Sequence, residues 1–90
     1  MRVALICTDK TGHLKTRMDN RAAHLAYIEA TGIVEMAGPF LNDQGEMTGS
    51  LVVLTVESVK DAQDWAADDP YARAGLFEAV TISEWKKVVG

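Results

Sequence analysis

The sequence has little cysteine and no long hydrophobic run. Cys7 is the only cysteine among 90 residues, which excludes an intrachain disulfide, a zinc ribbon and a redox pair of thiols. The longest apolar runs, residues 3–7 and 51–54, are far shorter than the roughly 20 residues of a membrane-spanning helix. No small-residue cleavage site follows the first run, so the N-terminus is not typical of a signal peptide. We therefore expect a cytoplasmic protein without a membrane partner.

Positive charge is also scarce. Nine Lys and Arg residues are outnumbered by thirteen Asp and Glu, so the formal net charge is -4. The basic surface of a protein that binds phosphate backbones is missing, and we do not expect nucleic acid as a partner. No metal site is indicated, because His-x-x-His, Cys-x-x-Cys and clustered carboxylates are all missing. Residues 45–49 do not make a phosphate loop, since no lysine follows them and they lie in a predicted hairpin.

What the sequence does contain is typical of a small globular domain. Hydrophobic residues make up 48% and charged residues 24%, which is too apolar for a disordered chain. The length predicts a single domain over residues 1–90. A chain this short leaves much of its surface exposed on folding, so a second surface that covers part of it would add stability.

Hydrophobic periodicity predicts an alternation of strands and helices. We expect strands at residues 2–8, 33–41, 51–56 and 77–89. We expect helices at residues 15–31, with Gly32 as the stop signal, and from the N-cap Ser58 to the residue before Pro70. The order β-α-β-β-α-β is that of the ferredoxin-like α+β fold, an antiparallel sheet with two helices on one face.

Two of the predicted strands are apolar on both faces. Residues 51–54 run without alternation, and the last strand has apolar residues at both parities. Strands of this kind are typical of sheets that are buried on both sides, whereas two helices cover only one side. We therefore expect a homodimer joined through its sheet faces.

The first predicted helix carries a polar stripe beside its apolar face. Helical phasing places Met18 and Leu25 in the apolar arc, with Arg17, Arg21 and His24 along one flank at spacings of four and three. Two arginines oppose a charged histidine, and a carboxylate or an anionic ligand would relieve that repulsion. The alternative is a solvated helix flank that has no ligand and is paired with Asp19 or with loop carboxylates.

Two further residues complete a candidate site. Asp69 precedes Pro70, where it is either a partner for His24 or simply the N-cap of a short turn. Ser50 immediately precedes the third predicted strand, where it either presents a hydroxyl to a ligand or is a plain turn residue. A neutral histidine held by a carboxylate is a general acid/base, and this chemistry needs no cofactor. We expect His13 to be a solvated surface residue and Cys7 to be a buried, inert thiol.

Four motifs, in order along nearly the whole chain, resemble the YciI-like family. They are Arg17-x-x-x-Arg21-x-x-His24-Leu25, Ala37-Gly38-Pro39, Gly49-Ser50 and Asp68-Asp69-Pro70-Tyr71-x-x-Ala74-Gly75-Leu76-Phe77. The resemblance implies a dimeric ferredoxin-like α/β barrel and a site centred on His24 and Asp69, with Ser50 and Arg21 nearby. Relatives of the same fold include muconolactone isomerase and a dehydrochlorinase of hydroxyquinols, so it also implies proton transfer on a small oxygenated ring.

The leading hypothesis is a cofactor-independent lyase or isomerase that acts on a small anionic or phenolic metabolite. In it His24 moves a proton, Asp69 orients His24, and Arg21 with Ser50 holds an anionic oxygen. The remaining substrate-binding candidates are Arg17 and Tyr71. One alternative is a non-catalytic module that binds a small molecule in the same pocket. The other is a purely structural dimeric domain.

Overall fold

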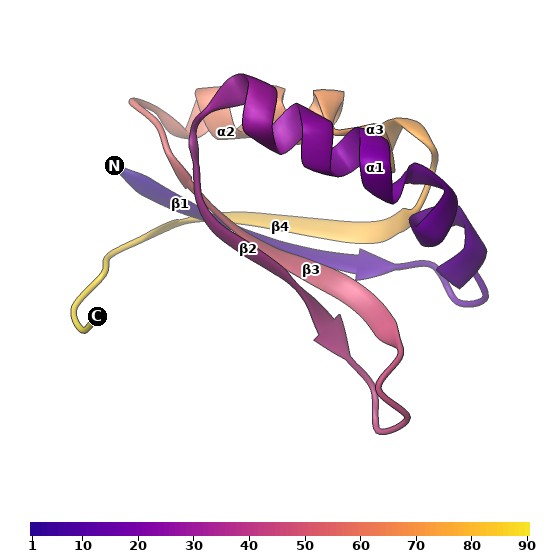
Figure 1. Ribbon diagram of the computed structural model, residues 1–90. Helices are drawn as coiled ribbons and strands as arrows, with labels where there is room; N and C mark the ends of the chain where they lie inside the picture. The colour runs from indigo at the N-terminus through magenta and orange to yellow at the C-terminus, as the bar shows by residue number, and fades with distance from the viewer.

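The computed structural model describes residues 1–90 and has a four-stranded antiparallel sheet with its helices on one face (Figure 1). The elements are β1 (Arg2–Asp9), α1 (Leu14–Thr31), β2 (Val34–Leu41), β3 (Met47–Thr55), α2 (Val59–Asp68), α3 (Pro70–Arg73) and β4 (Phe77–Trp85). The strand order is β2-β3-β1-β4. The predicted ferredoxin-like order is thereby confirmed. None of the three helices is both long and apolar enough to cross a membrane.

The helix ends follow their local sequence signals. Gly32 ends α1 with φ 65°, a left-handed conformation that favours glycine, and its N–H donates to the carbonyl of Ile28. Ser58 caps α2 through its hydroxyl, which accepts the Asp61 N–H at 3.2 Å. Pro70 opens α3, because its fixed φ suits the first helical position.

The apolar core lies between the helices and the two central strands. Val3, Leu5 and Cys7 of β1 alternate inward and pack with buried residues of β3 and with Trp65 of α2. Burial, followed by the charge of Asp69, raises the pKa of the Cys7 thiol to about 12. The thiol is therefore protonated at neutral pH, as expected of an inert core cysteine.

Two strand boundaries differ from the prediction. β3 begins at Met47 rather than Leu51, so Gly49 and Ser50 are inside a central strand and are not turn residues. β4 ends at Trp85 rather than at residue 89. The reason is that Trp85 pairs with Arg2, the first residue of β1, and the chain beyond it has no neighbouring strand.

The predicted apolar face of α1 was wrong for Met18 and Leu25, although Ile28 of the same face packs against the core. Met18 and Leu25 are 53% and 44% exposed, whereas Arg17 and His24 are buried against the sheet. The inward stripe of α1 is polar because these two side chains find buried partners, which satisfy the groups that burial removes from water.

The face of the sheet opposite the helices is bare in a single chain (Figure 1). The register places residues 4, 6, 51 and 53 on this face, because their neighbours in β1 and β3 point into the core. Ile6, Met36, Phe40 and Trp85 remain between 40% and 46% exposed. The predicted two-sided apolar character of the sheet is therefore present.

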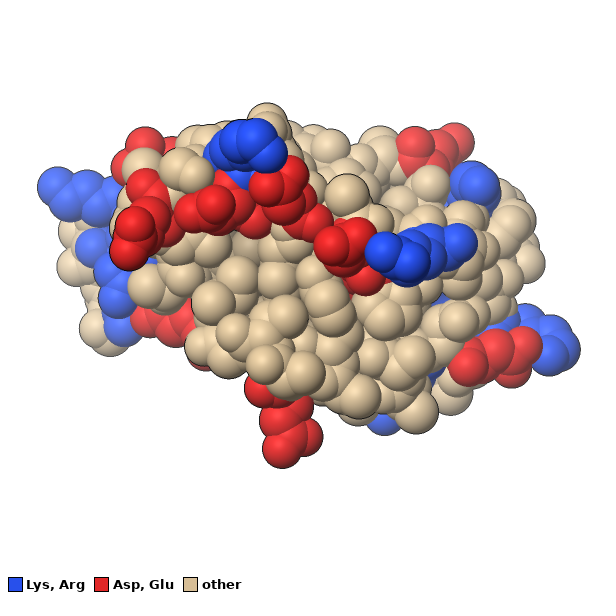
Figure 2. All heavy atoms as spheres, turned by 90° about the horizontal axis from the view of Figure 1, so that it is seen from above, with Lys and Arg blue, Asp and Glu red and all other residues tan.

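The surface above the helices carries more acidic than basic side chains (Figure 2). Lys60 pairs with Asp64 at 2.9 Å across one turn of α2, and Arg73 pairs with Asp68 at 2.8 Å. Such exposed pairs contribute little to stability, because water and salt screen them. The negative net charge of the chain is thus partly displayed on the helix side.

Candidate active site

A buried histidine and aspartate meet between the helices. His24 comes from the inner face of α1, and Asp69 lies at the junction of α2 and α3. The His24 Nδ1 and Asp69 Oδ1 atoms are 2.7 Å apart, and the two side chains are 7% and 4% exposed. An ionised carboxylate only accepts hydrogen bonds, so Nδ1 carries the proton and Nε2 is the basic nitrogen.

The same carboxylate also caps α3. Asp69 Oδ1 accepts the backbone N–H of Tyr71 at 3.0 Å in addition to the bond from His24. The turn before Pro70 therefore places one oxygen atom between a helix end and an imidazole. Both interpretations that the sequence left open for Asp69, cap and histidine partner, describe its observed contacts.

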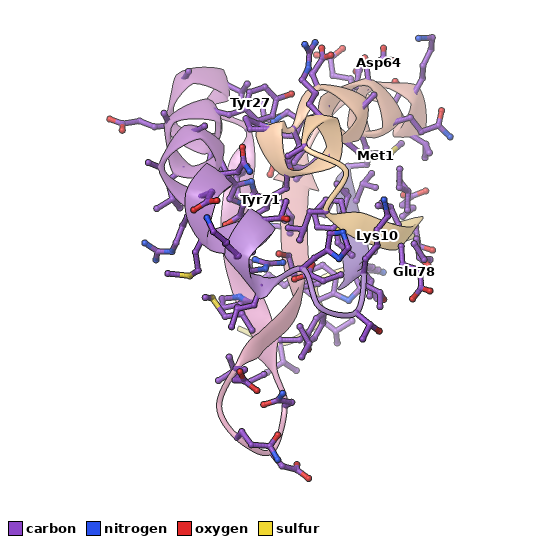
Figure 3. The ribbon with its side chains drawn as sticks, turned by 90° about the vertical axis from the view of Figure 1, so that its right-hand side faces the viewer. Met1, Lys10, Tyr27, Asp64, Tyr71 and Glu78 are labelled. Carbon is purple, nitrogen blue, oxygen red and sulfur yellow. The ribbon has the colours of Figure 1, made fainter.

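Tyr71 packs against the histidine ring. The Tyr71 and His24 ring centroids are 3.9 Å apart and the planes differ by 15°, which is a stacked arrangement. The Cζ atom of Arg17 lies 4.7 Å from the Tyr71 ring centroid, within range of a cation–π contact. Tyr71 belongs to α3, and in Figure 3 it lies on the side of α3 that faces α1. Burial raises the pKa of Tyr71, so its phenol is protonated at neutral pH.

Arg17 forms a buried ion pair with Asp9, at the end of β1. Its Nε and Nη2 atoms donate to the two carboxylate oxygens at 2.7 and 2.8 Å, and Nη2 also donates to Ser50 Oγ at 2.8 Å. Burial lowers the pKa of Arg17, but the hydrogen bonds and charge of Asp9 outweigh it and leave that pKa raised. Sequence reasoning missed Asp9. The only signal for it was that an arginine on an inward helix face requires a carboxylate partner.

Arg21 differs from Arg17. It is exposed, it lines the same cavity, and its guanidinium has neither a hydrogen bond nor an ion pair within the chain. One turn of helix therefore separates a guanidinium with a carboxylate partner from one without.

These side chains border a cavity of about 140 Å³. Arg17, Arg21, His24, Ser50 and Tyr71 form its polar side, while Asp69 lies behind His24. The apolar side is built by Leu25, Ile28, Ala37, Gly38, Pro39, Met47 and Val52. An apolar cavity of about 150 Å³ in another protein holds benzene, so this space suits a single six-membered ring. The structure thus brings all six predicted site residues together.

A larger and more polar hollow of about 670 Å³ lies at the end of the sheet, between residues 7–14, the β2–β3 hairpin and Glu78. His13 borders it and its Nδ1 contacts the carbonyl of Thr11 at 2.9 Å. Asp9 lines this hollow, and Met47 lines both cavities. We place the candidate site in the smaller cavity, because that cavity contains His24. Nowhere in the chain are three or more His, Cys, Asp and Glu side chains grouped to hold a metal ion.

The fold and the site have counterparts in solved structures. A 5-chloro-2-hydroxyhydroquinone dehydrochlorinase from Burkholderia phenoliruptrix AC1100, in complex with 2,5-dihydroxybenzoquinone, is 36% identical with a TM-score of 0.87, over 96% of this chain and 94% of that one. An antibiotic biosynthesis monooxygenase has a TM-score of 0.60 at 7% identity, over 98% of each chain, and shares the fold alone.

Curated relatives match over almost their full length. Protein YciI of Escherichia coli O6:H1 is 38% identical over 97 aligned positions, which cover 98% of this chain and 99% of the relative. An uncharacterised protein of Haemophilus influenzae is 33% identical with the same coverage. The family model of the YCII-related domain matches residues 1–86. On these grounds the chain belongs to the YCII-related family.

Proposed function

We propose that this protein is a small-molecule enzyme of the lyase or isomerase type, which transfers a proton on a single-ring phenolic or anionic substrate without a cofactor. The observation that carries the proposal is the buried His24–Asp69 pair beside a cavity of one-ring size. A carboxylate that holds Nδ1–H makes Nε2 a base and stabilises the imidazolium that forms when Nε2 accepts a proton.

Each proposed step is assigned to a residue that borders the cavity. His24 Nε2 accepts a proton from the substrate, and the electron pair left behind becomes an anionic oxygen. Arg21 pairs with that oxygen as a cation without an internal partner. Ser50 Oγ already accepts from Arg17, so its own proton is available to donate to the same oxygen. Tyr71 provides a flat wall for the ring.

The reaction closes when His24 returns the proton. In an isomerisation the proton goes to a different atom of the substrate, and in an elimination it leaves with the departing group. The dehydrochlorinase with its bound dihydroxybenzoquinone supports a substrate of this class, since that relative shares the fold at 36% identity. The step proposed for this chain is proton transfer on an oxygenated ring of that kind.

Ligand binding is the first test. In a thermal-shift screen of small phenols and carboxylates, we expect a true ligand at 100 times its Kd to add about 2.7 kcal/mol of stability. For a chain of this size the gain raises Tm by about 10–20 °C. Arg21→Gln should lose most of the shift, while Arg73→Gln, which removes an exposed arginine outside the cavity, should keep it. A library that shifts no melting curve would favour a purely structural domain. Binding without turnover would favour a non-catalytic module.

We also propose that two copies pair through the bare sheet faces. The exposed apolar residues of that face include Ile6 and Met36, and a large uncovered patch is unusual on a monomer. Light scattering at micromolar concentration is expected to give twice the mass of the chain. Ile6→Glu should yield monomers, whereas Met18→Glu, the same kind of change on the outer side of α1, should leave the dimer intact. A monomeric parent chain would contradict the barrel and leave the ferredoxin-like fold in place.

A further inference from the structure

We propose that Asp9 is a specificity-determining positioning residue, which compensates the charge of Arg17 so that Arg21 is the one cation left for an anionic ligand. The inference deepens the proposed function and rests on it for the identity of the site. It assigns different roles to Arg17 and Arg21, which lie one helical turn apart on α1. It also gives a role to a buried carboxylate that the proposed reaction does not use.

The hydrogen bonds of Arg17 are largely committed inside the protein. Three contacts occupy Nε and Nη2, two of them to Asp9 and one to Ser50. The flat guanidinium also lies near the Tyr71 ring. A bidentate pair with a carboxylate fixes both the position and the plane of a guanidinium. Arg17 is therefore held as a support for Ser50 and Tyr71.

The negative charge of Asp9 compensates the positive charge of Arg17 close to His24. The side chains of Arg17 and Asp9 are 3% and 6% exposed, so little water screens them and each is the principal counter-charge of the other. Without Asp9, two uncompensated arginines would act on His24 and disfavour its protonation. The proposed reaction requires His24 to accept a proton, and Asp9 removes one of the two opposing charges.

Other ionisable groups surround the His24–Asp69 pair, and they are the same in the parent and in single variants of Asp9 or Arg17. They are Arg21 and Tyr27 on α1, Asp68 at the end of α2, Tyr71 on α3 and Cys7 on β1. Only Asp9 faces Arg17 with both of its carboxylate oxygens.

A matched control exists elsewhere in the chain. Arg2 and Glu35 form a second bidentate pair, with Nε to Oε2 at 2.6 Å and Nη2 to Oε1 at 3.1 Å. This pair is partly exposed and neither residue lines either cavity. Glu35→Gln therefore removes the same charge from the same geometry at a distance from the site.

The first measurement needs no ligand. An NMR titration should show that Asp9→Asn moves the titration midpoint of His24 to lower pH, because Arg17 is then uncompensated. Arg17→Gln should move the His24 midpoint to higher pH, because Asp9 is then an unpaired negative charge. The two variants shift the midpoint in opposite directions, so either one alone tests the proposal if the other does not fold. Glu35→Gln should leave the midpoint in place. Equal midpoints in the parent and the two site variants would overturn the proposal.

The second measurement is a rescue, with sodium benzoate as the probe. Arg21→Gln should weaken benzoate binding, and adding Asp9→Asn should restore it by about threefold to tenfold, because Arg17 becomes available as a cation. Adding Glu35→Gln to Arg21→Gln should restore nothing, although the net charge is the same. Rescue by both second changes, or by neither, would overturn the proposal. A parent chain that binds no benzoate would count against the proposed function, and the His24 titration would then decide the role of Asp9.

Discussion

Replacing Asp69 by asparagine is expected to reduce the turnover rate by a factor on the order of 10² to 10⁴, while the protein folds like the parent. The amide oxygen of asparagine can occupy the place of Oδ1 and accept both the Tyr71 N–H and the His24 Nδ1–H. Asparagine is also as good an N-cap as aspartate. What it lacks is the negative charge that stabilises the imidazolium, so the His24 titration should move to lower pH.

Asp69→Ala is the matched structural comparison. It removes the cap of α3 and leaves the buried His24 Nδ1–H without an acceptor. We therefore expect the free energy of unfolding to fall by about 2–4 kcal/mol. The measurements are thermal melts and an NMR titration of His24 in the parent and both variants. If His24 titrates alike in the parent and in Asp69→Asn, Asp69 is only a cap and the enzymatic proposal loses its support.

Gly49→Ala is expected to be among the most destabilising single changes in the chain, at about 2–4 kcal/mol. A Cβ at this position would collide with the carbonyl oxygen of Cys7 in the neighbouring strand and would also touch Phe40. Because the obstacle is backbone, β1 and β3 would have to separate where Gly49 pairs with Thr8. The separation would also displace Ser50 and Asp9, which follow directly along each strand.

Gly38→Ala provides the comparison in the same sheet. Nothing lies within 4 Å of a Cβ at Gly38, and its φ is not positive. Alanine there also reduces the entropy of the unfolded chain, so we expect equal or slightly higher stability. By melting temperature, Gly49→Ala should lose about 10–20 °C and Gly38→Ala should lose none. A Gly49→Ala variant that melts with the parent would show that the two strands adapt without cost.

The elements with apolar inward faces were predictable from sequence. For α2 the pattern of Ala62 and Trp65 and the caps Ser58 and Asp69 all agree with one another and with the structure. β4 was predicted too long, because the apolar residues Val88 and Val89 continue its pattern beyond Trp85, which pairs with the first residue of β1. Strand length depends on the neighbouring strand, which a local pattern does not contain.

The face of α1 was not predictable in the same way. Hydrophobic phasing assumes that apolar residues are buried, but here Met18 and Leu25 are about half exposed, whereas Arg17 and His24 are buried against the sheet. The stripe itself and its link to Asp69 could be proposed from sequence. Its direction could not, because that depends on partners 8 and 45 residues away in the chain, Asp9 for Arg17 and Asp69 for His24.

The polar inner face of α1 means that docking of this helix and assembly of the site are one event. A helix with an apolar inner face adheres to a sheet in many registers, because dispersion and water exclusion have no direction. Helix α1 instead has directional anchors near both ends, Arg17 to Asp9 and Tyr27 to the carbonyl of Trp65, with His24 to Asp69 between them. Such anchors permit one rotation and one register of the helix. The polar residues that would carry the chemistry thus also encode the alignment of the fold around them.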